Sequence, residues 1–123
     1  MRRSQGALLL LVFVILTTTG WTSSRPENTQ VFNGEIMDSV CAHFKSHKHM
    51  MEEFKSMGSN KNGCVRQCRE QLRATYVLYD PVKEIAYEIA DPDKVARFPG
   101  RKVRISGALD KNQKIDVVSI LAD

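Results

Sequence analysis

Residues 102–121 of the chain read K-V-R-I-S-G-A-L-D-K-N-Q-K-I-D-V-V-S-I-L. In the first half, apolar or small side chains such as Ile105 alternate with polar ones such as Arg104, which is the period of a strand with one buried face. The letters D-K-N-Q-K then form a turn, and a second strand follows. Val117 and Val118 interrupt its alternation and predict a β-bulge or burial on both faces. The stretch is therefore expected to be a β-hairpin.

Three earlier stretches also have the pattern of strands. Residues 31–36 alternate in polarity, and Gly34 among them indicates a bulge or a sharp bend. Residues 75–79 are rich in β-branched and aromatic side chains, and residues 84–90 alternate again after a turn at 80–83. Together with the hairpin, these stretches predict five short strands.

The connection between the first two strands is long and has a different pattern. It includes residues 41–68, C-A-H-F-K-S-H-K-H-M-M-E-E-F-K-S-M-G-S-N-K-N-G-C-V-R-Q-C, which hold all three cysteines and all three histidines. Intervals of three and four residues, typical of one helix face, link Phe44, His47, Met51 and Phe54. A second short helix is expected at 63–72, so the whole segment 41–72 is interpreted as a helical insert.

Five short strands with one long connection favour a small Greek-key barrel over a sandwich, which needs more strands. Residues 98–120, F-P-G-R-K-V-R-I-S-G-A-L-D-K-N-Q-K-I-D-V-V-S-I, resemble the closing hairpin of OB-fold barrels. With G-E-I-M-D-S-V-C-A at 34–42, C-x-x-x-C at 64–68 and Y-V-L-Y-D at 76–80, the chain resembles a family of small exported bacterial domains of unknown function. The resemblance covers 31–121. It implies a mainly β, OB-fold-like barrel with a helical insertion between strands 1 and 2, and it implies no site residues.

The N-terminal residues 1–24 have the layout of a secretory signal peptide. Arg2 and Arg3 precede an unbroken apolar run from Ala7 to Leu16, and small polar residues follow it. Ten apolar residues span only about half of the hydrocarbon core as a helix, so no stable membrane span is expected after signal cleavage. The predicted location is therefore secreted or periplasmic.

The remaining chain divides into a linker at 25–30 and one domain at 31–123. The formal net charge of the whole chain is +4, and it falls to +2 without the two signal arginines. This small excess does not favour a polyanionic partner. A domain of this size has a modest core, so it gains stability from a covalent or metal link.

Cys41, Cys64 and Cys68 are the candidate anchors of the insert. In an oxidising compartment, a disulfide from Cys41 to Cys64 or to Cys68 would close a loop of more than twenty residues and contribute about 3 kcal/mol. Cys64 and Cys68 lie four residues apart on one helix face, where regular geometry disfavours a bond between them. The third thiol would then stay unpaired.

A soft-metal site is the alternative for the same residues. Cys41 and His43 with Cys64 and Cys68, and His47 on the adjoining turn, offer the ligands of a zinc or copper(I) ion. None of the established spacings C-x-x-C, H-E-x-x-H or C-x-x-C-H occurs in the chain. No cofactor is therefore expected unless copper or zinc binds here.

Other chemistry has less support in the sequence. No nucleophile elbow, phosphate-binding glycine loop or paired-carboxylate motif is present, so the chain is not expected to be an enzyme. A nucleic-acid surface would need the residues Tyr76, Tyr79, Tyr87, Arg97, Arg101, Lys102 and Arg104, and at least some of these tyrosines are expected in the core. The sequence predicts a non-catalytic binding or interaction module for an unknown protein or small ligand, with soft-metal binding as the alternative.

Overall fold

The computed structural model describes residue 20 and residues 27–123. The predicted signal peptide, apart from Gly20, and the start of the predicted linker lie outside the described residues. The elements in chain order are β1 (Gln30–Asp38), α1 (Ser39–His43), α2 (His47–Glu53), the 3-10 helix η1 (Lys55–Met57), α3 (Lys61–Leu72), β2 (Tyr76–Asp80), β3 (Ile85–Glu88), the 3-10 helix η2 (Pro92–Lys94), β4 (Lys102–Leu109) and β5 (Ile115–Ala122).

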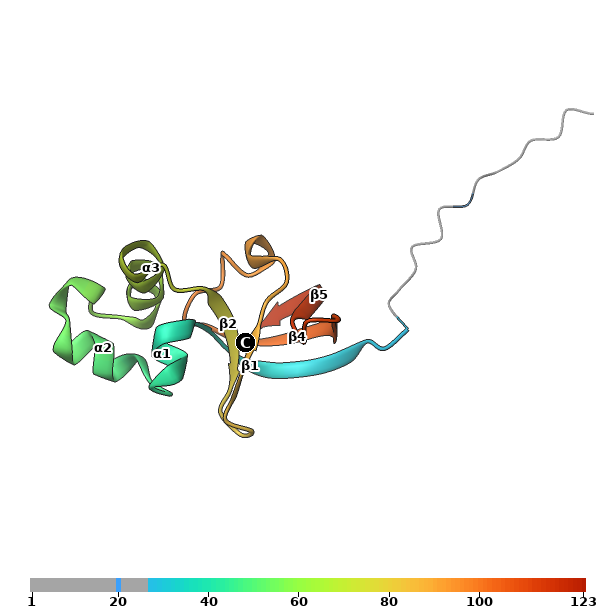
Figure 1. Ribbon diagram of the computed structural model, residues 1–123, viewed down its shortest axis with the longest axis horizontal. Coiled ribbons are helices and arrows are strands. Elements are labelled where there is room, and N and C mark those ends of the chain that lie inside the picture. Colours follow the sequence, from blue (N-terminus) through green and yellow to red (C-terminus); the bar gives the residue numbers. More distant parts are fainter. Residues whose placement is uncertain (1–19, 21–26) are drawn as a thin grey trace, which may run out of the picture.

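The strands form one five-stranded sheet in the order β3-β2-β1-β4-β5, and all neighbouring pairs are antiparallel. The helices α1, α2 and α3 follow β1 and gather at one end of the molecule, away from β4 and β5 (Figure 1). The predicted class, mainly β with helices between strands 1 and 2, is confirmed.

The central strand β1 changes partner halfway along its length. It pairs with β4 from Gln30 to Glu35 and with β2 from Glu35 to Asp38. A Cβ atom on Gly34 would lie 2.3 Å from the carbonyl oxygen of Tyr79, so only glycine fits this close approach. Gly34 thus lies next to the change of partner, and Glu35 lies at the junction of three strands.

The hairpin of β4 and β5 contains the irregularity that the two adjacent valines predict. Ser106 pairs with Ser119, and the next residue, Gly107, pairs with Val117. Val118 is therefore an extra residue on β5 and is exposed, whereas Val117 is buried. The predicted β-bulge is confirmed.

The two edges of the sheet approach each other without pairing along their length. One parallel bridge joins Ile89, just after β3, to Ile115 at the start of β5, and the amide of Ala90 donates to the Ile115 carbonyl oxygen at 3.0 Å. In the described region, this single contact stands where a closed barrel would have a continuous ladder of hydrogen bonds between the edge strands β3 and β5. The sheet is thus not closed into a barrel, which corrects that part of the expectation.

The insert is helical, but it is broken into shorter pieces than its spacing predicts. Lys45 adopts a positive φ of 56°, and the Ser46 side chain then caps α2 by accepting from the amide of Lys48. Phe44 and Phe54, the C-cap residues of α1 and α2, are 45% and 50% exposed, so the predicted apolar stripe is wrong at both positions. None of the helices in the described ranges is long and apolar enough to cross a membrane.

The buried side chains form two clusters. The sheet cluster lies within the curved sheet and contains Phe32, Ile36, Val65, Tyr76, Leu78, Ile89, Val95, Phe98, Val103, Ile105, Ile115 and Val117. The sulfur cluster lies between the insert and the other face of β1 and β2, and it contains Met37, Cys41, Ala42, Met50, Met57, Cys64, Cys68, Ala74, Val77 and Tyr79. The burial of Tyr76 and Tyr79 confirms that some tyrosines belong to the core.

Candidate metal centre

The junction of β1 with α1 positions the first thiol. Asp38 ends β1 and is fully buried, and its Oδ1 accepts hydrogen bonds from the amides of Val40 and Cys41 at 3.0 Å and 2.8 Å. This side-chain cap starts α1 directly after the strand. Cys41 is thereby held at the end of the strand with its Sγ turned inward and its side chain fully buried.

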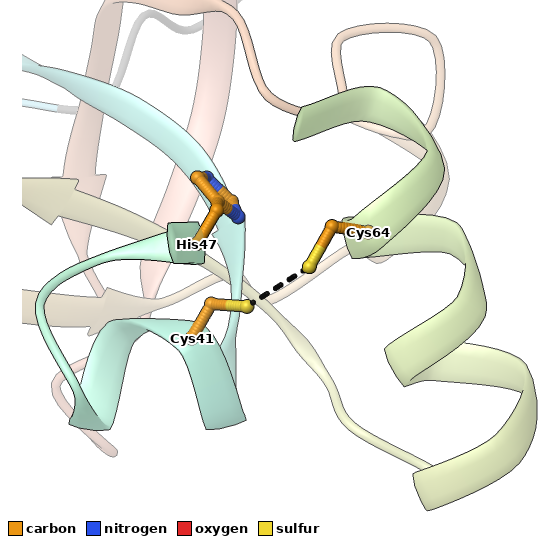
Figure 2. A group of neighbouring side chains, drawn as sticks. All are labelled: Cys41, His47 and Cys64. Carbon is orange, nitrogen blue, oxygen red and sulfur yellow. Dashed lines mark hydrogen bonds between the residues drawn. The ribbon is translucent and has the colours of Figure 1, made fainter. Parts of the chain in front are cut away.

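The helix α3 supplies the other two thiols. Asn60 caps it, since its Oδ1 accepts from the amide of Gly63 at 2.9 Å. Cys64 and Cys68 are one helical turn apart and both are fully buried, as their four-residue spacing predicts. The Sγ of Cys64 lies 3.5 Å from the Sγ of Cys41, and Figure 2 shows these two sulfurs facing each other between α1 and α3.

His47 completes the cluster from the start of α2. Its side chain is 4% exposed, and its Nε2 lies 2.6 Å from Oε1 of Glu35 on β1. Its other ring nitrogen, Nδ1, is buried and has no hydrogen-bond partner. Figure 2 shows the imidazole next to the sulfurs of Cys41 and Cys64. A buried nitrogen without a partner is costly, so this atom is an available ligand.

Two groups of ligand atoms are close enough together to hold an ion. One ligand atom each from Cys41, His47 and Cys64 lies within 4.8 Å of the others, and a second group, Asp38, Cys41 and Cys68, shares only Cys41 with the first. Two sulfurs that each bind one zinc at about 2.3 Å lie about 3.8 Å apart in a tetrahedron. The observed separation of 3.5 Å between Cys41 and Cys64 is close to that value.

The thiols are held in their neutral form. Burial, reinforced by Asp38 and then Cys64, raises the pKa of the Cys41 thiol far above its usual range. Burial also raises the pKa of Cys64, and burial with Asp38 raises that of Cys68 to about 12. Neutral buried thiols are poor nucleophiles, whereas a bound metal ion displaces their protons.

Of the five predicted ligands, the structure brings Cys41, His47 and Cys64 together in one group, and it places Cys68 with Cys41 in the second group. His43 is not among them. It is exposed at the end of α1, and its ring packs edge-on against Phe44 at a centroid distance of 5.2 Å. The chain break after α1 separates the two histidines, because His47 begins a new helix that turns it inward. His43 therefore lies outside both groups of ligand atoms, and its role as a ligand stays a prediction.

The sequence-based prediction missed two carboxylates at this site. Asp38 lies against the thiols with its Oδ2 buried and without a hydrogen-bond partner, and Glu35 contacts His47. The signal for Asp38 is the letters D-S before a short helical segment, which are typical of an N-cap. Glu35 reads as an ordinary polar residue of an alternating strand, so nothing local identifies it.

The three cysteines are free thiols in the structure. The separation of 3.5 Å between Cys41 and Cys64 exceeds the bond length of about 2.05 Å in a disulfide. The predicted disulfide therefore stays a prediction, and Cys41 with Cys64 is the pair for which it requires the smallest movement. Comparison of the chain with protein-family models, curated proteins and solved structures finds no match, so its function is inferred from the geometry of these side chains.

Proposed function

We propose that this chain is a non-catalytic, exported metal-binding protein that holds one soft metal ion, zinc or copper(I), through Cys41, His47, Cys64 and Cys68. The observation that carries the proposal is the buried Nδ1 of His47, which has no hydrogen-bond partner and belongs to a ring packed against buried thiols. A metal ion between Cys41, His47 and Cys64 would satisfy this nitrogen and two sulfurs, and Cys68, which groups with Cys41, is the proposed fourth ligand. Thiolate and imidazole ligands favour zinc and copper(I) over magnesium or calcium.

The strands serve this function as a scaffold. We propose that the curved sheet is an OB-like module of the small exported type that the sequence resembles, with secretion or export to the periplasm directed by residues 1–24. The insert is long enough to supply three helices, and each helix contributes at least one ligand. The site therefore depends on tertiary packing rather than on a short local motif, which accounts for the absence of C-x-x-C or H-E-x-x-H spacing.

Metal binding by the reduced protein tests the proposal. Competition against a chelator of known affinity, followed by native mass spectrometry, should give one zinc or one copper(I) ion per chain. Cys64→Ser and His47→Ala should weaken binding by at least ten-fold, whereas His43→Ala, which removes an exposed histidine of the same insert, should not. Equal losses in His43→Ala and His47→Ala, or no binding by the wild type, would contradict the proposal.

A second candidate is a binding module for a small ligand or a protein. It is favoured by a groove of about 590 Å³ beside the centre, lined by residues that include Glu35, His47, Met51, Tyr79 and Lys102. Native mass spectrometry of protein taken from the producing cell separates the two functions. A metal mass supports the first, and the mass of a co-purified organic ligand or partner supports the second.

A further inference from the structure

Glu35 on β1 contacts the first residues of two insert helices. Its Oε1 lies 2.6 Å from Nε2 of His47, the first residue of α2. Its Oε2 accepts from Nζ of Lys61, the first residue of α3, at 2.7 Å. The Glu35 side chain is only 13% exposed and His47 is 4% exposed, so their contact is largely shielded from water, whereas Lys61 is 54% exposed. One carboxylate thus links β1 to the helix that carries His47 and to the helix that carries Cys64.

The two contacts of Glu35 indicate which nitrogen of His47 bears the proton. One carboxylate oxygen accepts from Nζ of Lys61, and the other faces Nε2 of His47. An ionised carboxylate only accepts hydrogen bonds. The short contact therefore requires a proton on Nε2 of His47, and in the neutral ring this leaves a lone pair on Nδ1. That is the buried nitrogen that has no partner.

We propose that Glu35 is a positioning residue of the metal centre, which fixes the His47 ring and its Nε2–H tautomer so that Nδ1 is presented to the metal. The inference rests on the proposed metal-binding function and adds a residue that does not itself bind the ion. A carboxylate that accepts from the free N–H of a metal-bound histidine also makes that histidine a stronger ligand. Lys61 contacts the other oxygen of the carboxylate and balances its charge.

The Glu35→Gln variant separates this role from simple packing. Glutamine keeps the shape of the side chain, but it loses the charge and can donate its amide to Nε2, which favours the opposite tautomer. We expect zinc affinity to fall by about ten-fold to a hundred-fold. Glu88→Gln is the matched control, because Glu88 also pairs with a lysine, Lys114, but lies on β3. It should leave the affinity unchanged.

Lys61→Met tests whether the carboxylate matters only as a link between helices. It removes the contact with α3 but leaves the bond to His47, so its zinc affinity should fall less than that of Glu35→Gln. Equal losses in the two variants would mean that Glu35 acts only as a structural link, and would overturn the proposal.

Nitrogen chemical shifts of the His47 ring provide a readout that needs no metal. In the metal-free wild type at neutral pH, Nε2 should carry the proton and Nδ1 should not, and Glu35→Gln should shift the ring toward the other tautomer. A proton on Nδ1 in the wild type, or an unchanged zinc affinity in Glu35→Gln, overturns the role of Glu35 while leaving the proposed function intact. Failure of the wild type to bind zinc or copper(I) instead contradicts the proposed function itself.

Discussion

The two buried clusters of this domain are built from different chemistry. The sheet cluster consists of branched aliphatic and aromatic side chains, such as Ile36, Leu78 and Ile105, which pack in defined rotamers. In the sulfur cluster, methionine, cysteine and alanine supply eight of the ten members. Methionine is flexible and fills space without specifying one arrangement. The insert therefore has less packing to define its position than the sheet has.

The buried polar side chains also distinguish the sulfur cluster from the sheet cluster. Three polar side chains are buried in the described part of the chain, and two of them, Asp38 and His47, border the sulfur cluster. Each of these two has one buried polar atom without a hydrogen-bond partner. Such groups weaken a cluster unless a ligand satisfies them. We therefore interpret the sheet cluster as the source of stability and the sulfur cluster as a binding site whose order depends on what it binds.

The largest expected effect comes from the sheet cluster. Ile105→Asp and Val103→Asp each bury an unpaired charge, so each should destabilise the domain by several kcal/mol and unfold it. Arg104→Asp lies between them on the exposed face of β4 and should be nearly neutral. Urea unfolding should be used to measure the free energy of unfolding of all three variants. Similar losses at all three positions would show that the register of β4 is wrong.

A smaller, local effect is expected from the sulfur cluster. Cys41→Ser should loosen the insert, because Cys41 contacts α3 through Cys64 and adjoins the Asp38 cap. Amide hydrogen exchange should then accelerate across residues 39–72 while β2 to β5 keep their protection. Unchanged exchange in the insert would mean that Cys41 is an ordinary buried side chain.

The buried thiols of the sulfur cluster should also make the stability of the domain depend on pH. The raised pKa values of Cys41, Cys64 and Cys68 keep these thiols protonated in the folded state, whereas unfolded cysteines ionise near pH 8.5. The unfolded state therefore binds fewer protons above that pH, and stability should fall as the pH rises from about 8 to 9.5. Urea unfolding of the reduced, metal-free protein should show this fall. Cys64→Ser should make it shallower, and an equal slope in this variant would argue against buried neutral thiols.

The contrast between the clusters also explains what the sequence could predict. Alternation of Ile105 with Arg104, and its interruption at Val117 and Val118, correctly predicts the hairpin and its bulge, because strand period is a local property. The three cysteines, His43 and His47 were all predicted as candidate ligands, since their residue types are those of a soft-metal site. What the sequence failed to show is that His43 lies apart from His47.

That failure has a physical cause in the chain break after α1. The apolar spacing continues through residues 44–46 as though one helix ran on, but Lys45 adopts a positive φ and Ser46 starts a new helix. Only tertiary packing determines which side of that break is buried. Contacts such as that between Glu35 and His47, twelve residues apart and on different elements, leave no periodic trace in the sequence.

X-ray absorption spectroscopy of the zinc-loaded, reduced protein directly tests whether the sulfur cluster binds the metal ion. We expect three sulfur ligands at about 2.3 Å and one nitrogen ligand at about 2.0–2.1 Å, from Cys41, Cys64, Cys68 and His47. In Cys68→Ser the sulfur count should fall to two, while His43→Ala should give the wild-type spectrum. A shell made only of nitrogen and oxygen atoms would place the ion on exposed histidines such as His49, and would contradict a metal centre in the sulfur cluster.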